Sequence, residues 1–185
     1  MTLIDDFLEL LHLWRDRGAV TFDADEVLAP HASVQSFDLA AFSRDAARLT
    51  AARLEVSGAL GALGADSLTS EVWSGAGGSA AAEAAGVLSA TAAAGLDALQ
   101  THAVALATAD AVLGGVLGEY RASMTVVAAP LAAGIVLPDA AQELDARLDL
   151  AARTGRAASK AVDDALDVLG DHWRSSGELI LAGER

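Results

Sequence analysis

The chain has 185 residues, a length that suits one domain with a real hydrophobic core and is short for two. Its 26 acidic residues outnumber its 12 basic ones, and the formal net charge of −14 disfavours nucleic-acid binding because it repels phosphate backbones. The absence of cysteine excludes disulfides, thiolate chemistry and cysteine-based zinc sites. Hydrophobic residues make up 53% of the chain and aromatic residues only 4%, and alanine and leucine dominate, so we expect an all-α fold.

The N-terminal segment, residues 1–37, predicts one short helix and a linker. Apolar residues at spacings of three and four indicate an amphipathic helix over residues 3–17 that ends at Gly18: Leu3, Phe7, Leu10, Leu11 and Trp14. From residue 19 to 37 the pattern is lost, which favours a linker with one helical turn at 23–28. The chain opens with acids and has no small-residue cleavage site after them, so no secretory signal peptide is expected.

The central segment, residues 38–128, predicts a hairpin of two long helices. Asp38 is a candidate N-cap for a first helix that runs to about Ser67. Large side chains recur every seven residues and define the hairpin seam: Phe42, Leu49, Val56 and Leu63 in the first helix, and Leu99, Leu106, Leu113 and Tyr120 in the second. Many other positions are glycine, which costs about 1 kcal/mol each inside a helix. Such helices depend on their neighbours for stability.

A Trp-x-Gly triplet, Trp73-Ser74-Gly75, lies between these two helices. Gly75 is able to adopt positive φ where the chain reverses, while the indole of Trp73 covers the end of the helix pair. Ser79 is a candidate N-cap for the second helix, and Glu83 follows near its first turn. The sequence therefore predicts a pinned turn at this point.

Residues 38–128, with this triplet at the apex of two Ala-rich helices, resemble the Trp-X-Gly (WXG) superfamily of type VII, or ESX, secretion systems. The resemblance implies a helical hairpin that pairs with a partner hairpin into a four-helix bundle. Members often carry a Tyr-x-x-x-Asp/Glu export signal after the second helix, whereas Tyr120 is followed four residues later by Met124. The resemblance therefore implies either a partner that carries the export signal or a chain that is not exported.

The C-terminal segment, residues 129–185, predicts a last helix from Pro138 to about Ser175. Its apolar stripe is Leu144, Leu148, Val162, Leu166, Leu169 and Trp173. The apolar run 122–137 is too short to span a bilayer, which needs about 20 residues, so we expect buried packing and no membrane partner. The whole chain reads as an elongated helical hairpin with flanking helices, four-helix-bundle-like, in a single domain.

No constellation in the sequence indicates catalysis, a cofactor or a metal. The run 75–80 matches G-x-G-x-x-A, but the strand and βαβ context of a dinucleotide site are missing. Four histidines, His12, His31, His102 and His172, are scattered without ligand spacing, and a solvent-facing or satisfied role is expected for each. The acids of the last helix, Asp163, Asp164, Asp167 and Asp171, read as a solvated face. No Gly-x-Ser-x-Gly elbow is present, and we expect no enzyme.

The sequence thus favours a non-enzymatic, type VII secretion-associated protein that binds another helical chain by bundle formation, with Trp73, Ser74 and Gly75 at the interacting end. Such a protein would be secreted or at the cell surface by a signal-peptide-independent route. The alternative is a cytoplasmic, self-associating helical bundle with a structural role. A third hypothesis, membrane insertion of residues 122–137, is opposed by the net charge.

Overall fold

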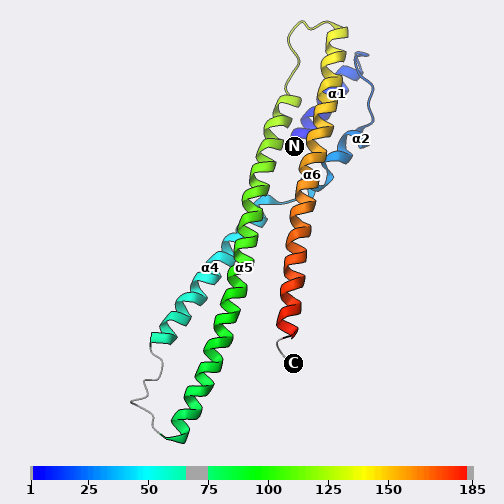
Figure 1. Ribbon diagram of the computed structural model, residues 1–185. Coiled ribbons are helices and arrows are strands. Elements are labelled where there is room, and N and C mark those ends of the chain that lie inside the picture. The colour runs from blue at the N-terminus through cyan, green and yellow to red at the C-terminus, as the bar shows by residue number, and fades with distance from the viewer. Residues whose placement is uncertain (1, 66–74, 183–185) are drawn as a thin grey trace. The chain divides into compact units, whose positions relative to one another are not determined.

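The structure, a computed structural model, describes residues 2–65 and 75–182, with side chains for 2–62 and 75–175. It is 87% helical with no strand among the described residues, so the expected all-α class is confirmed. The four long helices are α1 (Leu3–Arg15), α4 (Leu39–Ala65), α5 (Ala76–Val127) and α6 (Leu137–Ala182) (Figure 1). Three short elements separate α1 from α4: α2 (Ala24–Leu28), η1 (Ala29–His31) and α3 (Ala32–Ser36).

The chain forms two compact units. Unit 1 combines residues 1–39 with 111–168, and unit 2 combines 40–110 with 169–185. The division falls inside α5 and α6, so each of these helices contributes one part to each unit. Residues far apart in the sequence therefore share a unit.

Helix α1 begins with a capping box. Thr2 donates its backbone N–H to Asp5 Oδ2 at 2.6 Å, and Asp5 donates its N–H to Thr2 Oγ1 at 3.4 Å. The backbone hydrogen bond from Thr2 lowers the pKa of the Asp5 carboxyl. The helix ends at Arg15, two residues before the predicted end, and Gly18 follows at φ +81°. Glycine adopts that left-handed conformation without a Cβ penalty.

The segment between α1 and α4 contains more helix than the sequence predicted. The expected turn at 23–28 is present as α2, capped by Asp23, which accepts from the Asp25 N–H at 2.8 Å. Helices η1 and α3 were expected to be linker. Each spans five residues or fewer, so neither is long enough to show a hydrophobic period. Pro30 lies in the first turn of η1, where its fixed φ suits a helix start.

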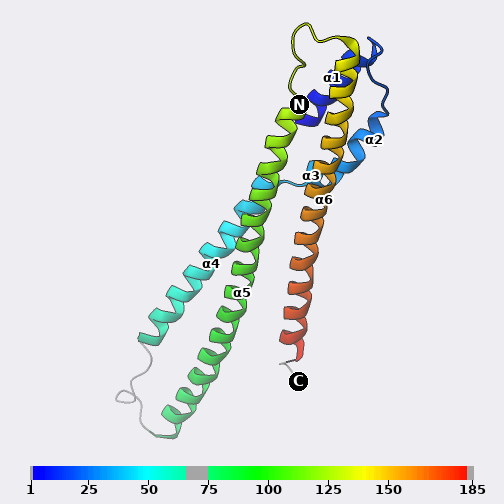
Figure 2. The same cartoon turned by 45° about the horizontal axis from the view of Figure 1, so that its top comes forward.

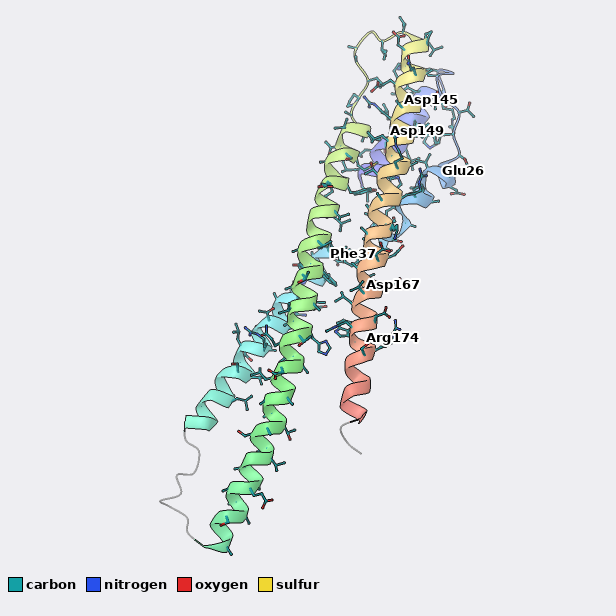
Figure 3. The ribbon with its side chains drawn as sticks, viewed as in Figure 1. Glu26, Phe37, Asp145, Asp149, Asp167 and Arg174 are labelled. Carbon is teal, nitrogen blue, oxygen red and sulfur yellow. The ribbon has the colours of Figure 1, made fainter. Side chains whose placement is uncertain are left out.

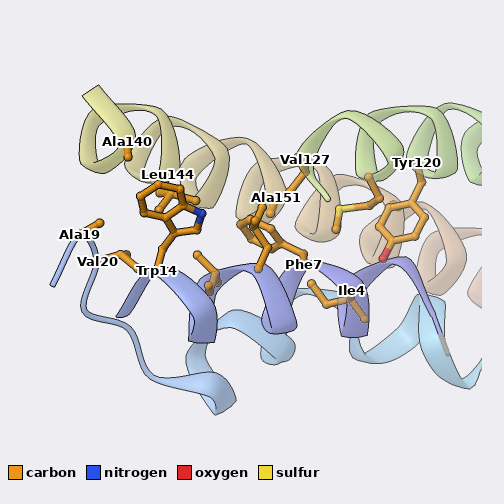
Figure 4. Close-up of a cluster of buried hydrophobic side chains, with 14 residues drawn as sticks. Ile4, Phe7, Trp14, Ala19, Val20, Tyr120, Val127, Ala140, Leu144 and Ala151 are labelled. Atoms are coloured by element: carbon orange, nitrogen blue, oxygen red, sulfur yellow. The ribbon is translucent and has the colours of Figure 1, made fainter. Parts of the chain in front are cut away.

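Unit 1 has a well-filled hydrophobic core. The face of α1 formed by Ile4, Phe7 and Leu11 is at most 1% exposed, and it packs against α5 and α6 residues that include Met124 and Leu144 (Figure 4). Full burial of each such side chain contributes roughly 1.5–3 kcal/mol, so α1 is an integral part of unit 1.

Arg147 closes the end of α5 within unit 1. Its guanidinium donates to the carbonyl oxygens of Val127, at 3.1 Å, and of Ala129, and it pairs with Glu143 at 2.9 Å. The last carbonyls of a helix have no partner within the helix. Arg147, whose side chain is only 13% exposed, satisfies the carbonyl of the last α5 residue from about three turns inside α6 and so anchors the 128–136 connection.

Unit 2 contains an antiparallel helix pair. Helix α4 and the first part of α5 lie side by side with opposite chain directions in both views (Figures 1 and 2). Ser43 donates its hydroxyl to Asp110, and Arg53 donates to Gln100, so polar contacts join the two helices at two levels. Gly75 precedes α5 with φ +96°, the positive value expected for it. The pair is the hairpin that the sequence indicated for this segment.

Candidate functional site

The surface of unit 2 exposes more large apolar side chains than the unit buries. Those more than 40% exposed among the described residues of unit 2 are Leu54, Val56, Val87, Leu88, Val104 and Trp173. We call these six residues the apolar surface of unit 2. Leu88 on α5 is 71% exposed and Leu54 on α4 is 57% exposed, so both helices of the pair contribute.

The buried interior of unit 2 is small by comparison. Its buried hydrophobic residues are Ala46, Ala103, Leu106 and Leu169, with Phe42 and Leu49 partly buried against them. Two of the four are alanine, which adds little apolar area. The large apolar side chains that unit 2 exposes therefore outnumber the large ones that it buries.

The predicted seam residues are found in three situations. Leu106, Leu113 and Tyr120 are buried. Phe42, Leu49 and Leu99 are half-buried, and Val56 is 42% exposed as part of the apolar surface of unit 2. Leu113 and Tyr120 belong to unit 1, whereas the other five belong to unit 2. The Leu63 side chain, Trp73 and Ser74 lie outside the described residues, so the role of the Trp-Ser-Gly turn in binding stays a prediction.

Helix α5 is long and apolar enough to cross a membrane by length and composition. Its most apolar window has a mean hydropathy of 1.3, and 22% of that window is buried. One such helix is weak evidence for a membrane span, because core helices of soluble proteins pass the same test.

The apolar run 122–137, expected to be buried, is mixed: Met124 and Val127 are buried, but Val126 and Val136 are exposed.

A buried histidine joins three elements of unit 1. The His31 side chain is 0% exposed, and its Nδ1 lies 3.0 Å from the hydroxyl of Tyr120 on α5. Gly155 of α6 lies against the ring, and a Cβ added there would lie 2.6 Å from His31 Cε1 and 2.7 Å from Nδ1. Only glycine leaves room for the imidazole at this point.

Two hydrogen bonds continue this junction along α6. Ser159 donates its hydroxyl to the Pro30 carbonyl at 2.9 Å, and Ser33 donates to Asp163 Oδ2 at 3.2 Å. Positions 155, 159 and 163 are spaced by four and lie on one face of the helix. We call these contacts, together with those of His31 to Tyr120 and Gly155, the His31 junction. It fixes η1 and α3 to α6.

Burial lowers the pKa of the His31 imidazole and raises the pKa of the Tyr120 phenol, because both charged forms lose solvation. Both groups are therefore neutral near pH 7. Sequence reasoning missed this pair, since 89 residues separate its members. The expectation of a satisfied histidine agrees with the contact at Nδ1, whereas Nε2 has no hydrogen-bond partner among the described residues.

Two histidines that the sequence suggested were scattered meet in unit 2. The rings of His102 and His172 have centroids 4.9 Å apart and planes at 80°.

The acids of α6 fit a solvated face. Asp163, Asp164, Asp167 and Asp171 are all exposed, Asp164 pairs with Lys160 and Asp171 with Arg174 (Figure 3 shows Asp167 and Arg174).

The described residues contain no group of three or more side chains suited to a metal ion. A hollow of about 560 Å³ in unit 1 is lined by residues of 131–147, among them the carboxylates Asp139 and Glu143. Glu143 is already engaged by Arg147. This lining brings no nucleophile together with a base, so its geometry does not suggest catalysis.

Comparison with protein-family models, curated proteins and solved structures finds no match to this chain. The site's own geometry is therefore the basis for assigning a function.

Gly155→Ala should destabilise the protein. The added methyl group meets a buried ring, and overpacking of this kind costs typically 1–3 kcal/mol, more than the roughly 1 kcal/mol that alanine gains over glycine in a helix. Urea unfolding followed by circular dichroism measures the difference. Gly115→Ala is the matched control: its Cβ meets nothing within 4 Å, so it should stabilise. In a His31→Ala background the Gly155→Ala effect should become stabilising; a penalty that persists there would show that the ring is not the obstacle.

Stability should fall in acid through His31. The unfolded imidazole titrates near pH 6.5 and the folded one lower, so below pH 6.5 the unfolded state binds more protons. Neutral, buried His31 therefore contributes to the free energy of unfolding above pH 6.5. This contribution is lost as the pH falls toward the pKa of the folded imidazole, at up to about 1.4 kcal/mol per pH unit. His31→Gln should therefore flatten the dependence of unfolding free energy on pH between 6.5 and 5. Equal slopes in the wild type and in the His31→Gln variant would refute the assignment.

Proposed function

We propose that the chain is a non-enzymatic protein that binds a second helical chain through unit 2, and that it works in type VII secretion as a WXG-like substrate or partner. The observation that carries the binding role is the excess of exposed over buried apolar side chains in unit 2. Covering Leu54, Val87 and Leu88 with a partner helix would supply the hydrophobic contacts that the unit itself lacks.

The composition of α5 in unit 2 supports a helical partner. Residues 76–98 are mostly alanine, glycine and serine, with Glu83 and Asp97 as their charged residues. Small side chains let a second helix backbone approach closely, and the glycines make the uncovered helix costly. Recognition of an amphipathic helix in such a groove is a recurring mode of binding.

The link to type VII secretion rests on the resemblance of residues 38–128 to WXG hairpins. The antiparallel pair of α4 and α5 and the positive φ of Gly75 are compatible with that family's architecture. The missing Tyr-x-x-x-Asp/Glu signal makes a signal-bearing partner the natural complement, by which the chain would leave the cell without a signal peptide. The alternative is self-association through the same surface, in a structural role without secretion.

The native mass of the complex recovered by affinity purification from the chain's own host separates these functions. We expect a 1:1 complex with a small helical chain that carries a Tyr-x-x-x-Asp/Glu tail. A homo-oligomer would favour the structural alternative, and a lone monomer would contradict both.

A variant pair locates the binding surface. Val87→Asp places a charge in the apolar surface of unit 2 and should weaken the association at least tenfold, because about 1.4 kcal/mol of binding free energy corresponds to that factor. Val168→Asp is the control, since Val168 is similarly exposed, at 68% against 64%, but belongs to unit 1. Titration of the purified partner measures both. Equal losses would show that the effect is not specific to the apolar surface of unit 2.

A further inference from the structure

His102 and His172 bring two metal-ligating side chains together within unit 2. His102 is on α5 and His172 on α6, and each side chain is partly buried. Their ring centroids are 4.9 Å apart. His102 Nδ1 is shielded from solvent and has no hydrogen-bond partner among the described residues, an arrangement that is costly unless something satisfies the nitrogen.

We propose that this pair binds a divalent transition-metal ion of the class that prefers imidazole, with Zn²⁺ as the reference ion. Neutral imidazole is a favoured ligand of Zn²⁺, Cu²⁺ and Ni²⁺. One tetrahedral ion bonded to a nitrogen of each ring at about 2.0–2.1 Å places the two ring centres roughly 5 Å apart. The observed separation is close to this value, and the rings, whose planes lie at 80° in an edge-to-face contact, would turn about their side-chain bonds to chelate an ion with little movement of the helices.

The site has two protein ligands, because no third ligating side chain joins the pair among the described residues. Water or a ligand from another molecule completes the coordination. A site with open positions of this kind holds its ion reversibly, and Cu²⁺ binds more tightly than Zn²⁺ or Ni²⁺ in the usual order of divalent metals.

The bound ion would fasten the part of α6 in unit 2 to α5. In unit 2 this part of α6 contributes Leu169 to the small buried cluster, while Trp173 is 50% exposed. A metal bridge at position 172 would add a fixed point about one turn beyond Leu169. The inference is independent of the proposed partner, since both ligands come from one chain.

Isothermal titration of the full chain with ZnCl₂ at pH 7.5, after removal of any affinity tag, tests the proposal. One ion should bind per chain, and thermal unfolding should shift to higher temperature with Zn²⁺ because the ion binds the folded state. His102→Gln and His172→Gln should each weaken binding at least tenfold, and the double variant should lose little more than either single one, because a chelate needs both rings. His12→Gln, at an exposed position of unit 1, should bind like the wild type.

Circular dichroism of each variant verifies that its helices remain. Wild-type affinity in either single variant with intact helices, or no heat of binding at 1 mM Zn²⁺, would overturn the proposal. A missing partner complex would leave this result unaffected, so the two hypotheses fail separately.

Discussion

The contact between the His31 ring and the backbone of Gly155 is the constraint on which unit 1 depends. Because residue 155 has no side chain, a buried imidazole fits between α6 and Tyr120 of α5. The hydrogen bonds from Ser159 and Ser33 then hold η1 and α3 along the same face of α6. The apolar face of α1 is buried in the same unit, against residues of α5 and α6. A chain of polar and steric contacts thus positions a hydrophobic core.

Unit 2 has no equivalent interior. Its hydrogen bonds, Ser43 to Asp110 and Arg53 to Gln100, join α4 to α5, but its buried apolar residues are few and small. The side chains that would build a larger core are at the surface, with Leu88 71% exposed. This contrast between the large core of unit 1 and the small core of unit 2 is the physical basis of the proposed binding role, because burial of apolar surface against a partner is favourable.

Sequence patterns predicted what depends on local periodicity. The helical class, the apolar face of α1 and the positive φ of Gly75 follow from spacing and from glycine chemistry. Helices η1 and α3 were missed, since they are too short for a period to appear and are held by contacts with α6. The His31 junction and the ring contact of His102 and His172 join residues distant in sequence, which no spacing rule connects. Likewise, Leu106 is buried while Val56 of the same predicted seam is 42% exposed, because heptad spacing alone does not show how far a helix is covered.

Amide hydrogen exchange of the isolated chain tests the central claim, that unit 1 is self-sufficient and unit 2 awaits a partner. Exchange reports local opening, and protection follows the burial of the surrounding contacts. We expect strong protection in 3–15, 111–127 and 137–168, and clearly weaker protection in 40–62 and 76–110. Equal protection of the two units in the chain alone, at a concentration where it is monomeric, would contradict the account, because unit 2 would then need no partner to be stable.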